Sequence, residues 1–304
     1  MNRLHLMTVF VAVAEEEGFA AGARRLHMSP PAVTRAVAAL EERLGVKLLN
    51  RTTRYVRTTE AGQRYLEDAR RVLAEADAAD EAAAGVNAEP RGHLTVTAPV
   101  LFGRMFVMPG IIEYLERYPG TEVSALFLDR IVNLLEEGMD VGVRIGELPD
   151  SSMRALRVGS VRLLLCASPE YLQRHGPPGK PQDLLEHSMI ASSAGGNAID
   201  WRFATPSGIS TLRIRPRLTV TTNDAALEAA RRGFGITRLL SYQIAPQLAA
   251  GELKVILKEY EPAPWPVHIV HREGRYASAK VRAFIDLMAK RLRAELAYDK
   301  KFCV

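Results

Sequence analysis

The chain has 304 residues, of which 47% are hydrophobic and 25% are charged, and its formal net charge is +5. This composition is too apolar for a disordered chain, and the length allows two or three domains with separate cores. The only cysteines, Cys166 and Cys303, exclude a disulfide framework and lack the paired spacing of a zinc site, so we expect a reducing, cytoplasmic setting.

Residues 4–20, LHLMTVFVAVAEEEGFA, predict an amphipathic first helix rather than a signal peptide. His5 and Thr8 interrupt the apolar run, three glutamates follow it, and no small-residue cleavage site comes after it. No other stretch of the chain approaches the roughly 20 apolar residues that a membrane span needs. The sequence therefore predicts no membrane partner.

Residues 20–58 predict two short helices joined by a tight connection and followed by a basic hairpin. Ser29 is expected to cap the second helix, and Pro30 fits its first position, where a missing N–H has no cost. One buried stripe is predicted at Val33, Val37, Leu40 and Leu44. The opposite face, near the start of the helix, carries Pro31, Thr34, Arg35 and Ala38. Such a mixture suits a recognition helix whose first turns enter the major groove.

The positive charge of the chain is concentrated in the same segment. Residues 20–58 contain eight arginine or lysine residues against two glutamates, a net charge of +6 that exceeds the +5 of the whole chain. A local excess of this kind is the electrostatic footprint of a nucleic-acid contact rather than a general solubility device.

Residues 59–84 predict a long alanine-rich helix that begins at Thr59. A seam of apolar or small residues follows at spacings of three and four, at Leu66, Ala69, Leu73, Ala76 and, two turns later, Ala83. This seam indicates pairing of two such helices, although Asp80 interrupts it and a solvated connector helix is the alternative. Gly85 to His93 then break the periodicity and indicate a hinge.

From residue 93 onward the pattern is α/β. Strands are predicted at 94–100, 121–128 and 140–146, with helices at 108–118 and 130–138 between them, as expected of parallel crossovers. A second unit has strands at 161–168, 189–193 and 218–222 and helices at 169–176 and 224–233. A strand at 267–272 and a helix at 278–296 close the chain. The chain is therefore expected to run through the first α/β unit, cross into the second and return to the first with this last strand and helix. Two crossings between the units make a hinged pair of lobes around a cleft.

The sequence offers several signals of an enzyme, and none of them holds. Gly233-Phe234-Gly235 follows a helix rather than a strand, so it indicates a helix end and not a dinucleotide loop. His268 and His271 fall on opposite faces of one strand, and Cys166 lies inside an apolar strand as a small core residue. We expect no catalytic residue, metal or cofactor. A solute-binding protein and an α/β enzyme fused to a DNA-binding domain are the alternatives.

The order of these parts resembles a LysR-type transcriptional regulator. The resemblance covers essentially the whole chain and is most specific at residues 29–62, SPPAVTRAVAALEERLGVKLLNRTTRYVRTTEAG, with weaker matches at LLCASPEYL, RRGFGIT and AAGELKVIL. It implies an α/β protein with a winged helix-turn-helix at 1–58 and a dimerising linker helix and hinge at 59–92. It further implies two Rossmann-like subdomains similar to periplasmic solute-binding proteins, here at 93–161 with 265–304 and at 162–264.

The resemblance also implies partners and DNA-contacting residues. The partners are double-stranded DNA, a small-molecule inducer, further copies of the chain in dimers or tetramers, and RNA polymerase. In the helix-turn-helix the implied contacts are Ser29, Pro30, Pro31, Thr34 and Arg35, and in the wing they are Arg51, Thr53 and Arg54. A guanidinium can grip guanine or phosphate with two hydrogen bonds, whereas hydroxyls mainly fix the register on phosphates.

In this family the effector lies between the two lobes, near the N-termini of helices, which favours an anionic ligand. The matching positions here are Val100, Leu101, Phe102, Leu128, Asp129, Arg144, Ser192, Ser193, Thr222, Asn223 and Thr237. Val100 and Phe102 stand where some relatives have hydroxyl side chains, so the pocket is expected either to be more apolar or to rely on backbone groups. Arg144 would pair with an anionic ligand or, equally well, with a local carboxylate such as Asp140.

Overall fold

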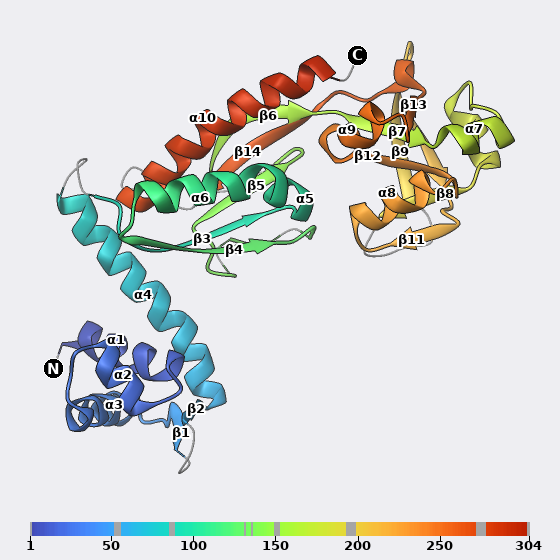
Figure 1. Cartoon of the computed structure of the whole chain (residues 1–304). Coiled ribbons are helices and arrows are strands. Elements are labelled where there is room, and N and C mark those ends of the chain that lie inside the picture. Colours follow the sequence, from blue (N-terminus) through green and yellow to red (C-terminus); the bar gives the residue numbers. More distant parts are fainter. Residues whose placement is uncertain are drawn as a thin grey trace. The chain divides into compact units, whose positions relative to one another are not determined.

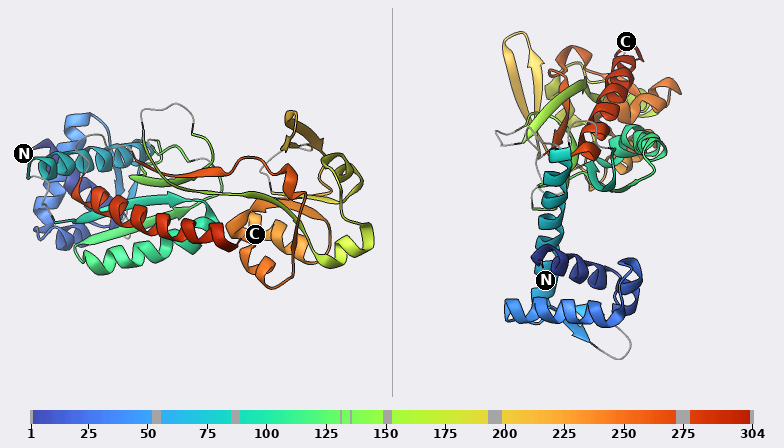
Figure 2. Two further views of the ribbon diagram at one scale, coloured as in Figure 1. Left: turned by 90° about the horizontal axis from the view of Figure 1, so that it is seen from above. Right: turned by 90° about the vertical axis from the view of Figure 1, so that its left-hand side faces the viewer.

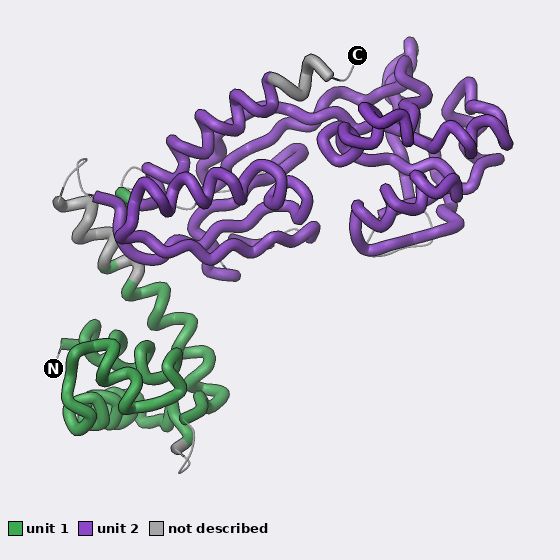
Figure 3. Tube along the Cα trace, in the orientation of Figure 1, with its two compact units in different colours: residues 1–88, 275–279 green, residues 89–274, 280–304 purple. Residues whose placement is uncertain are grey.

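The computed structural model of the chain describes residues 2–51, 56–84, 89–130, 132–134, 136–148, 153–192, 199–271 and 278–302. The chain divides into two compact units (Figure 3). Unit 1 comprises residues 1–88 and 275–279, and unit 2 comprises residues 89–274 and 280–304. Within the described ranges, no helix is both long enough and apolar enough to cross a membrane.

Unit 1 contains three packed helices, a small hairpin and a long helix. These elements are α1 (Arg3–Glu15), α2 (Phe19–Arg25), α3 (Pro30–Leu44), β1 (Leu49–Arg51), β2 (Val56–Thr58) and α4 (Glu60–Ala84). Phe10 of α1 and Val37 and Leu40 of α3 are fully buried in one core. The predicted stripe on α3 is wrong at its last position, because Leu44 is 36% exposed. Glu41, one turn earlier, is buried instead and faces the hairpin.

The long helix α4 begins as the sequence predicts. The hydroxyl of Thr59 accepts a hydrogen bond of 2.9 Å from the N–H of Gly62, which is the bond of a helix cap. Gly62 is required here, since a Cβ at this position would lie 1.9 Å from the carbonyl oxygen of Leu48. Leu66 and Ala69 are buried within unit 1, so the first half of the predicted seam packs on the unit's own core. The side chains of Asp80 and Ala83 lie outside the described residues.

The first subdomain of unit 2 is built on a five-stranded sheet in the order β4-β3-β5-β14-β6. The strands are β3 (Gly92–Ala98), β4 (Thr121–Phe127), β5 (Val141–Ile145), β6 (Arg154–Val161) and β14 (Trp265–His271). β3 pairs in parallel with β4 and β5, whereas β14 runs antiparallel to β5 and β6. Helices α6 (Met108–Arg117) and α10 (Ala279–Phe302) cover one face of this sheet (Figure 1).

Three segments of the first subdomain differ from the prediction, and one of them is the strand β6, which the sequence analysis missed. The helix expected at 130–138 is wrong: the described part of this segment forms turns in which Val132 and Leu134 are buried and Arg130 pairs with Glu137. Tertiary burial of Val132 and Leu134, which are only two positions apart, overrides the helical pattern of the segment. The helix before α6 also contains an unpredicted π-helical turn, η1 (Gly103–Val107), which follows the short helix α5 (Val100–Phe102).

The second subdomain has its own five-stranded sheet in the order β11-β8-β12-β7-β13. Its strands are β7 (Leu163–Ala167), β8 (Met189–Ser192), β11 (Leu218–Val220), β12 (Ile236–Leu240) and β13 (Lys254–Ile256). Its helices are α7 (Pro169–His175), α8 (Asn223–Arg231) and α9 (Ser241–Ala249), with 3-10 turns at Pro181–Glu186 and Lys258–Tyr260. A hairpin of β9 (Ile199–Thr205) and β10 (Gly208–Ile214), which the sequence analysis missed, packs through Trp201 and Phe203 on one face.

The chain passes between the two subdomains twice, once from β6 into β7 and once on the way back to β14 (Figure 2). Arg162 stands at the first crossing and Glu261 on the return. The Arg162 guanidinium binds the Glu261 carboxylate with two hydrogen bonds, of 2.9 Å from Nε and 2.8 Å from Nη2. This bidentate ion pair ties the two crossing segments together.

Candidate nucleic-acid interface and effector region

The first turn of α3 leaves its exposed face free of internal bonds. Ser29 occupies the cap position in an extended conformation, but its side chain makes no capping hydrogen bond, so that part of the prediction is wrong. Pro31 has no N–H to donate, and the N–H of Ala32 is bonded to the Ser29 carbonyl at 3.0 Å. Ser29, Pro30, Pro31 and Arg35 are exposed and Thr34 is half-buried. The predicted contact residues therefore share one accessible helix start.

The buried Glu41 connects this helix to the wing. Its carboxylate accepts hydrogen bonds from the N–H groups of Leu48 and Leu49, at 2.9 and 3.1 Å, and from Lys47 Nζ at 2.8 Å. Burial raises the pKa of Glu41, but the bonds from Lys47 and the two backbone groups outweigh it, so the pKa lies below its ordinary value. The chain entering the hairpin is therefore fixed to the last turn of α3.

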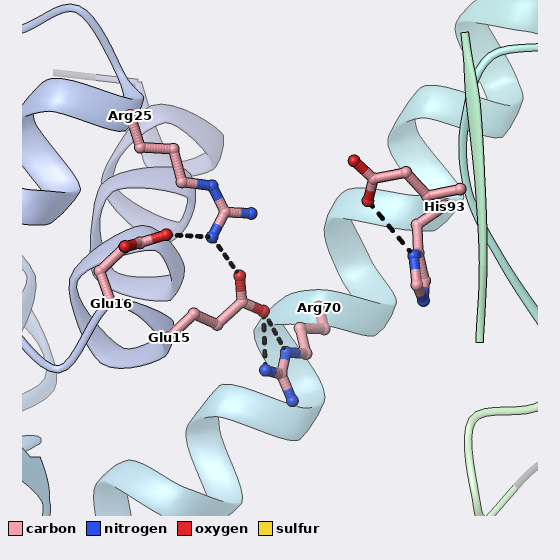
Figure 4. A network of polar contacts seen from close by, with 6 residues as sticks. Glu15, Glu16, Arg25, Arg70 and His93 are labelled. Carbon is pink, nitrogen blue, oxygen red and sulfur yellow. Dashed lines mark hydrogen bonds and ion pairs between the residues drawn. The ribbon is translucent and has the colours of Figure 1, made fainter. Parts of the chain in front are cut away.

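A second carboxylate, Glu15, joins three helices of unit 1. It accepts hydrogen bonds from Arg25 of α2 at 2.7 Å and from Arg70 of α4 at 2.8 Å (Figure 4). Burial raises the pKa of Glu15, but the hydrogen bonds and charges of Arg70 and Arg25 outweigh this effect, so the pKa lies below its ordinary value. Arg25 and Lys47 thus serve unit 1 internally, which leaves fewer of the eight basic side chains for an anionic partner.

The wing consists of β1 and β2, which pair antiparallel from Leu49 with Thr58 to Arg51 with Val56. The N–H of Val56 is bonded to the carbonyl of Glu17 at 3.2 Å, which fixes the second strand to the connection between α1 and α2. Thr53 and Arg54, predicted as wing contacts, lie outside the described residues, as does the side chain of Arg51.

The predicted effector residues of the first subdomain occupy different environments. The backbone N–H of Val100, at the start of α5, donates a 3.0 Å hydrogen bond to Asp129 Oδ1. Val100 is 37% exposed, whereas Leu101 and Phe102 are buried. The Phe102 ring packs on Tyr242 of the second subdomain, and Leu128 is half-buried. Val100 and Asp129 are therefore brought together at the surface, while Phe102 belongs to a contact between the subdomains.

In the second subdomain, the ends of β8 and β11 meet. The hydroxyl of Ser192 donates a hydrogen bond to the side-chain oxygen of Asn223, the first residue of α8. Thr222 before it is exposed, and Ser193 lies outside the described residues. Thr237 is buried and donates to the carbonyl of Ile190 at 3.3 Å. Ser192, Thr222 and Asn223 thus form one accessible polar group. Thr237 does not belong to it, because its side chain is buried and bonded to a backbone carbonyl.

Arg144 is anchored by backbone carbonyls rather than by an acid. Its Nη2 donates to the carbonyl of Val132 at 2.9 Å and its Nη1 to that of Val143 at 3.3 Å. Burial lowers the pKa of Arg144, and the nearby Glu137 partly offsets this effect. Asp140, the alternative partner in the sequence analysis, accepts instead from the N–H and the hydroxyl of Thr95.

The residues that resembled enzyme motifs have structural roles. Gly233 follows α8 with a φ of 73°, the backbone conformation of a helix end. Cys166 is fully buried, and burial raises the pKa of its thiol to about 12, which leaves it unreactive. His268 pairs with Arg144 and His271 with Val141 in the register of β14, on opposite faces of the sheet. In the described part of the chain, no three His, Cys, Asp or Glu side chains are grouped to hold a metal ion.

A winged helix-turn-helix with an accessible recognition helix, in one chain with a two-subdomain α/β unit, defines a DNA-binding regulator with a ligand-binding domain. Comparison with known families agrees. Residues 4–63 match the bacterial regulatory helix-turn-helix protein family of the LysR type, and residues 87–293 match the LysR substrate binding domain. The chain belongs to the LysR family of transcriptional regulators. It is therefore a DNA-binding regulator and not an enzyme, which excludes both alternatives raised from the sequence.

Individual relatives are similar over nearly their whole length. The transcriptional regulator CrgA of Neisseria meningitidis serogroup B is 32% identical over 287 residues, which is 94% of this chain and 96% of CrgA. The transcriptional activator AaeR of Escherichia coli K12 is 33% identical, over 94% of this chain and 93% of AaeR. A solved CrgA structure has a TM-score of 0.61 and 32% identity, covering 96% and 99% of the two chains. Full-length AphB of Vibrio cholerae has the same TM-score at 25% identity, covering 95% of this chain and 99% of AphB.

Proposed function

We propose that the chain reads operator DNA with the start of α3 in the major groove and the wing on the adjoining phosphates. The observation that carries this proposal is the accessible first turn of α3, where the Ser29 side chain makes no capping bond and Arg35 is exposed. The opposite face of the same helix is buried through Val33, Val37 and Leu40, so it holds the recognition face rigidly. Ser29, Pro30, Pro31 and Thr34 fix the register, and Arg35 reads a base edge. Arg51, Thr53 and Arg54 bind phosphates from the wing.

The regulator responds to a small molecule bound between the two subdomains. Val100, Leu128 and Asp129 on one side, with Ser192, Thr222 and Asn223 on the other, are accessible members of the predicted effector set, each at the end of a strand or the start of a helix. The apolar surface of Val100 supports an effector with an apolar body. We assign the effector a negative charge, because helix starts and arginine side chains favour anions.

The response is transmitted by a change in the relative position of the subdomains, and copies of the chain assemble through α4 into dimers or tetramers on DNA. Half of the predicted seam remains available, since Leu73 and Ala76 are only half-buried in the single chain. The regulator acts in the cytoplasm, where its operator lies, and RNA polymerase is a further partner.

The experiment that tests this function is genome-wide mapping of the sites bound by the full-length chain, compared with the Arg35→Ala variant. We expect a small set of sites sharing one sequence motif, lost or redistributed in the variant. The genes next to those sites then identify the chemistry of the effector. Binding spread evenly over the genome, or a map unchanged by Arg35→Ala, would refute sequence reading by α3.

A further inference from the structure

Arg238 in β12 carries a positive charge that no side chain of the described ranges neutralises. The residue is half-buried, and its Nη2 donates to the carbonyl of Arg202 at 2.7 Å. Its Nε is buried and has no hydrogen-bond partner in the described part of the chain. Burial alone lowers the pKa of Arg238 to about 10, with no opposing contribution from a carboxylate.

The guanidinium is held in place by two aromatic rings. Its central carbon lies 5.5 Å from the ring centroid of Trp201 and 5.2 Å from that of Phe203, both in β9 of the hairpin. Contacts of this kind are weaker than the penalty of removing an unpaired ion from water. The rings therefore position the charge without compensating it, and an external anion would complete the site.

Other half-buried arginines of unit 2 are better satisfied. Arg162 makes its bidentate pair with Glu261, and Arg144 donates to two carbonyls with Glu137 nearby. In the hairpin beside Arg238, the acid Asp200 pairs with Arg213, at 3.6 Å. Among the described residues, Arg238 thus differs from Arg162 and Arg144 in having no carboxylate nearby, a property that makes it a candidate for a functional site.

The helix starts expected to attract an anionic effector already carry acids of their own. The N–H of Val100 is bonded to Asp129, and Asp224 stands in the first turn of α8, where a bond from Thr222 lowers its pKa. A second carboxylate at either helix start would meet like charge. A basic side chain is therefore the better partner for the negative charge of a ligand. Among these side chains we favour Arg238, because it has no carboxylate nearby in the described part of the chain.

We propose that Arg238 is the anchor for the carboxylate of a small anionic ligand in the second subdomain. This inference deepens the proposed effector response and rests on it. Because Nε is buried, a carboxylate would accept from the terminal nitrogens of this guanidinium, at its half-buried end. The rings of Trp201 and Phe203 hold the guanidinium plane in a fixed orientation for that approach.

Trp201 provides a direct reporter, because the chain has only one other tryptophan, Trp265. The full-length chain with Trp265→Phe is titrated with sodium benzoate and, separately, with the uncharged benzamide, at constant ionic strength and without DNA. We expect a saturable change in Trp201 emission with benzoate in the millimolar range or below, and none with benzamide. An equal response to both compounds, or no response to benzoate up to its solubility, would overturn the proposal.

Two variants in the same background separate a ligand anchor from a structural residue. Arg238→Met keeps an unbranched stem between the rings but removes the charge, so benzoate affinity should fall at least tenfold while the Tm stays equal or rises. The control Arg213→Met removes an exposed arginine of the hairpin and should change affinity less than twofold. Unchanged benzoate binding in Arg238→Met, or a Tm several degrees lower together with unaltered affinity, would make the guanidinium structural. Operator binding, measured separately, reports the proposed function independently.

Discussion

The ring of Tyr242, at the start of α9, packs edge-on against the ring of Phe102 in α5, with centroids 5.2 Å apart and planes at 88°. Phe106, in the π-helical turn, completes the group at 5.7 Å from Tyr242. Both Phe102 and Tyr242 are buried, although they belong to different subdomains. This aromatic group and the Arg162–Glu261 pair hold the subdomains in their present arrangement. Phe102 thus acts as a packing residue between subdomains.

Replacement of Tyr242 should loosen this arrangement. Tyr242→Ala removes a buried aromatic ring and should lower the free energy of unfolding of unit 2 by about 3–5 kcal/mol, whereas Tyr242→Phe, which keeps the ring, should cost less than about 1.5 kcal/mol. Urea unfolding followed by circular dichroism measures both values. Equal losses in the two variants would show that the hydroxyl rather than the ring packing matters.

Arg35→Ala should weaken binding to a specific operator by roughly 1–3 kcal/mol without changing the Tm, because it removes an exposed charged contact and no core atom. Fluorescence anisotropy at fixed salt measures the affinity. Arg293→Ala, which removes an exposed arginine of α10, is the matched control and should leave affinity unchanged. Loss of affinity in the control would attribute the effect to net charge alone.

The wing residue Arg54 should behave differently from Arg35. Arg54→Ala is expected to lower affinity for all DNA sequences alike and to reduce the slope of log affinity against log salt by about one unit, as loss of one phosphate contact requires. Titrations over a range of salt concentrations, with operator and with unrelated DNA, give the slope. A loss confined to one base pair of the operator would instead show that Arg54 reads sequence.

Assembly should depend on Leu73 and Ala76, the half-buried residues of the seam on α4. Leu73→Asp places a charge where two helices would meet, so we expect a shift towards monomers and weaker binding to paired half-sites. Light scattering measures the mass of the assembly. Arg71→Asp, an exposed position two residues earlier, controls for the new charge on the same helix. A fully dimeric Leu73→Asp variant would place the main contact on unit 2.

The carboxylate of Glu41 should make the stability of unit 1 depend on pH. Because its pKa is lower in the folded chain than the ordinary value of 4.5, its stabilising contribution is present above that value and is lost as the pH falls through the folded pKa. Glu41→Gln should therefore cost about 1–3 kcal/mol at pH 7, and this difference should shrink on acidification below about pH 4.5. Urea unfolding at several pH values tests the trend. If the difference in unfolding free energy between the two proteins did not change with pH, the cost of Glu41→Gln would come from the poorer fit of the amide and not from the lost charge.

The sequence by itself determined the elements that local chemistry controls. The proline at the first position of α3, the Thr59 cap of α4 and the strands β3, β4, β5, β7, β8, β11 and β14 follow from backbone geometry and short-range periodicity, and they lie close to where the pattern predicts them. The sequence analysis missed the strands β6, β12 and β13 of the same sheets. The motif at residues 29–62 also identified the family, because its winged helix-turn-helix is a compact local unit.

Only the tertiary structure decided which polar side chains find partners on other elements and which apolar side chains are buried. Glu15 and Glu41 are indistinguishable from other acids in the sequence, and only the folded chain gives Glu15 its partners on two other helices and buries Glu41 against the hairpin. Residues 130–138 have helical spacing, yet burial of Val132 and Leu134 produces turns. The environment of Arg238 depends on the β9–β10 hairpin folding over β12. Contacts between residues distant in the chain depend on the packing of whole elements, and no short-range pattern encodes them.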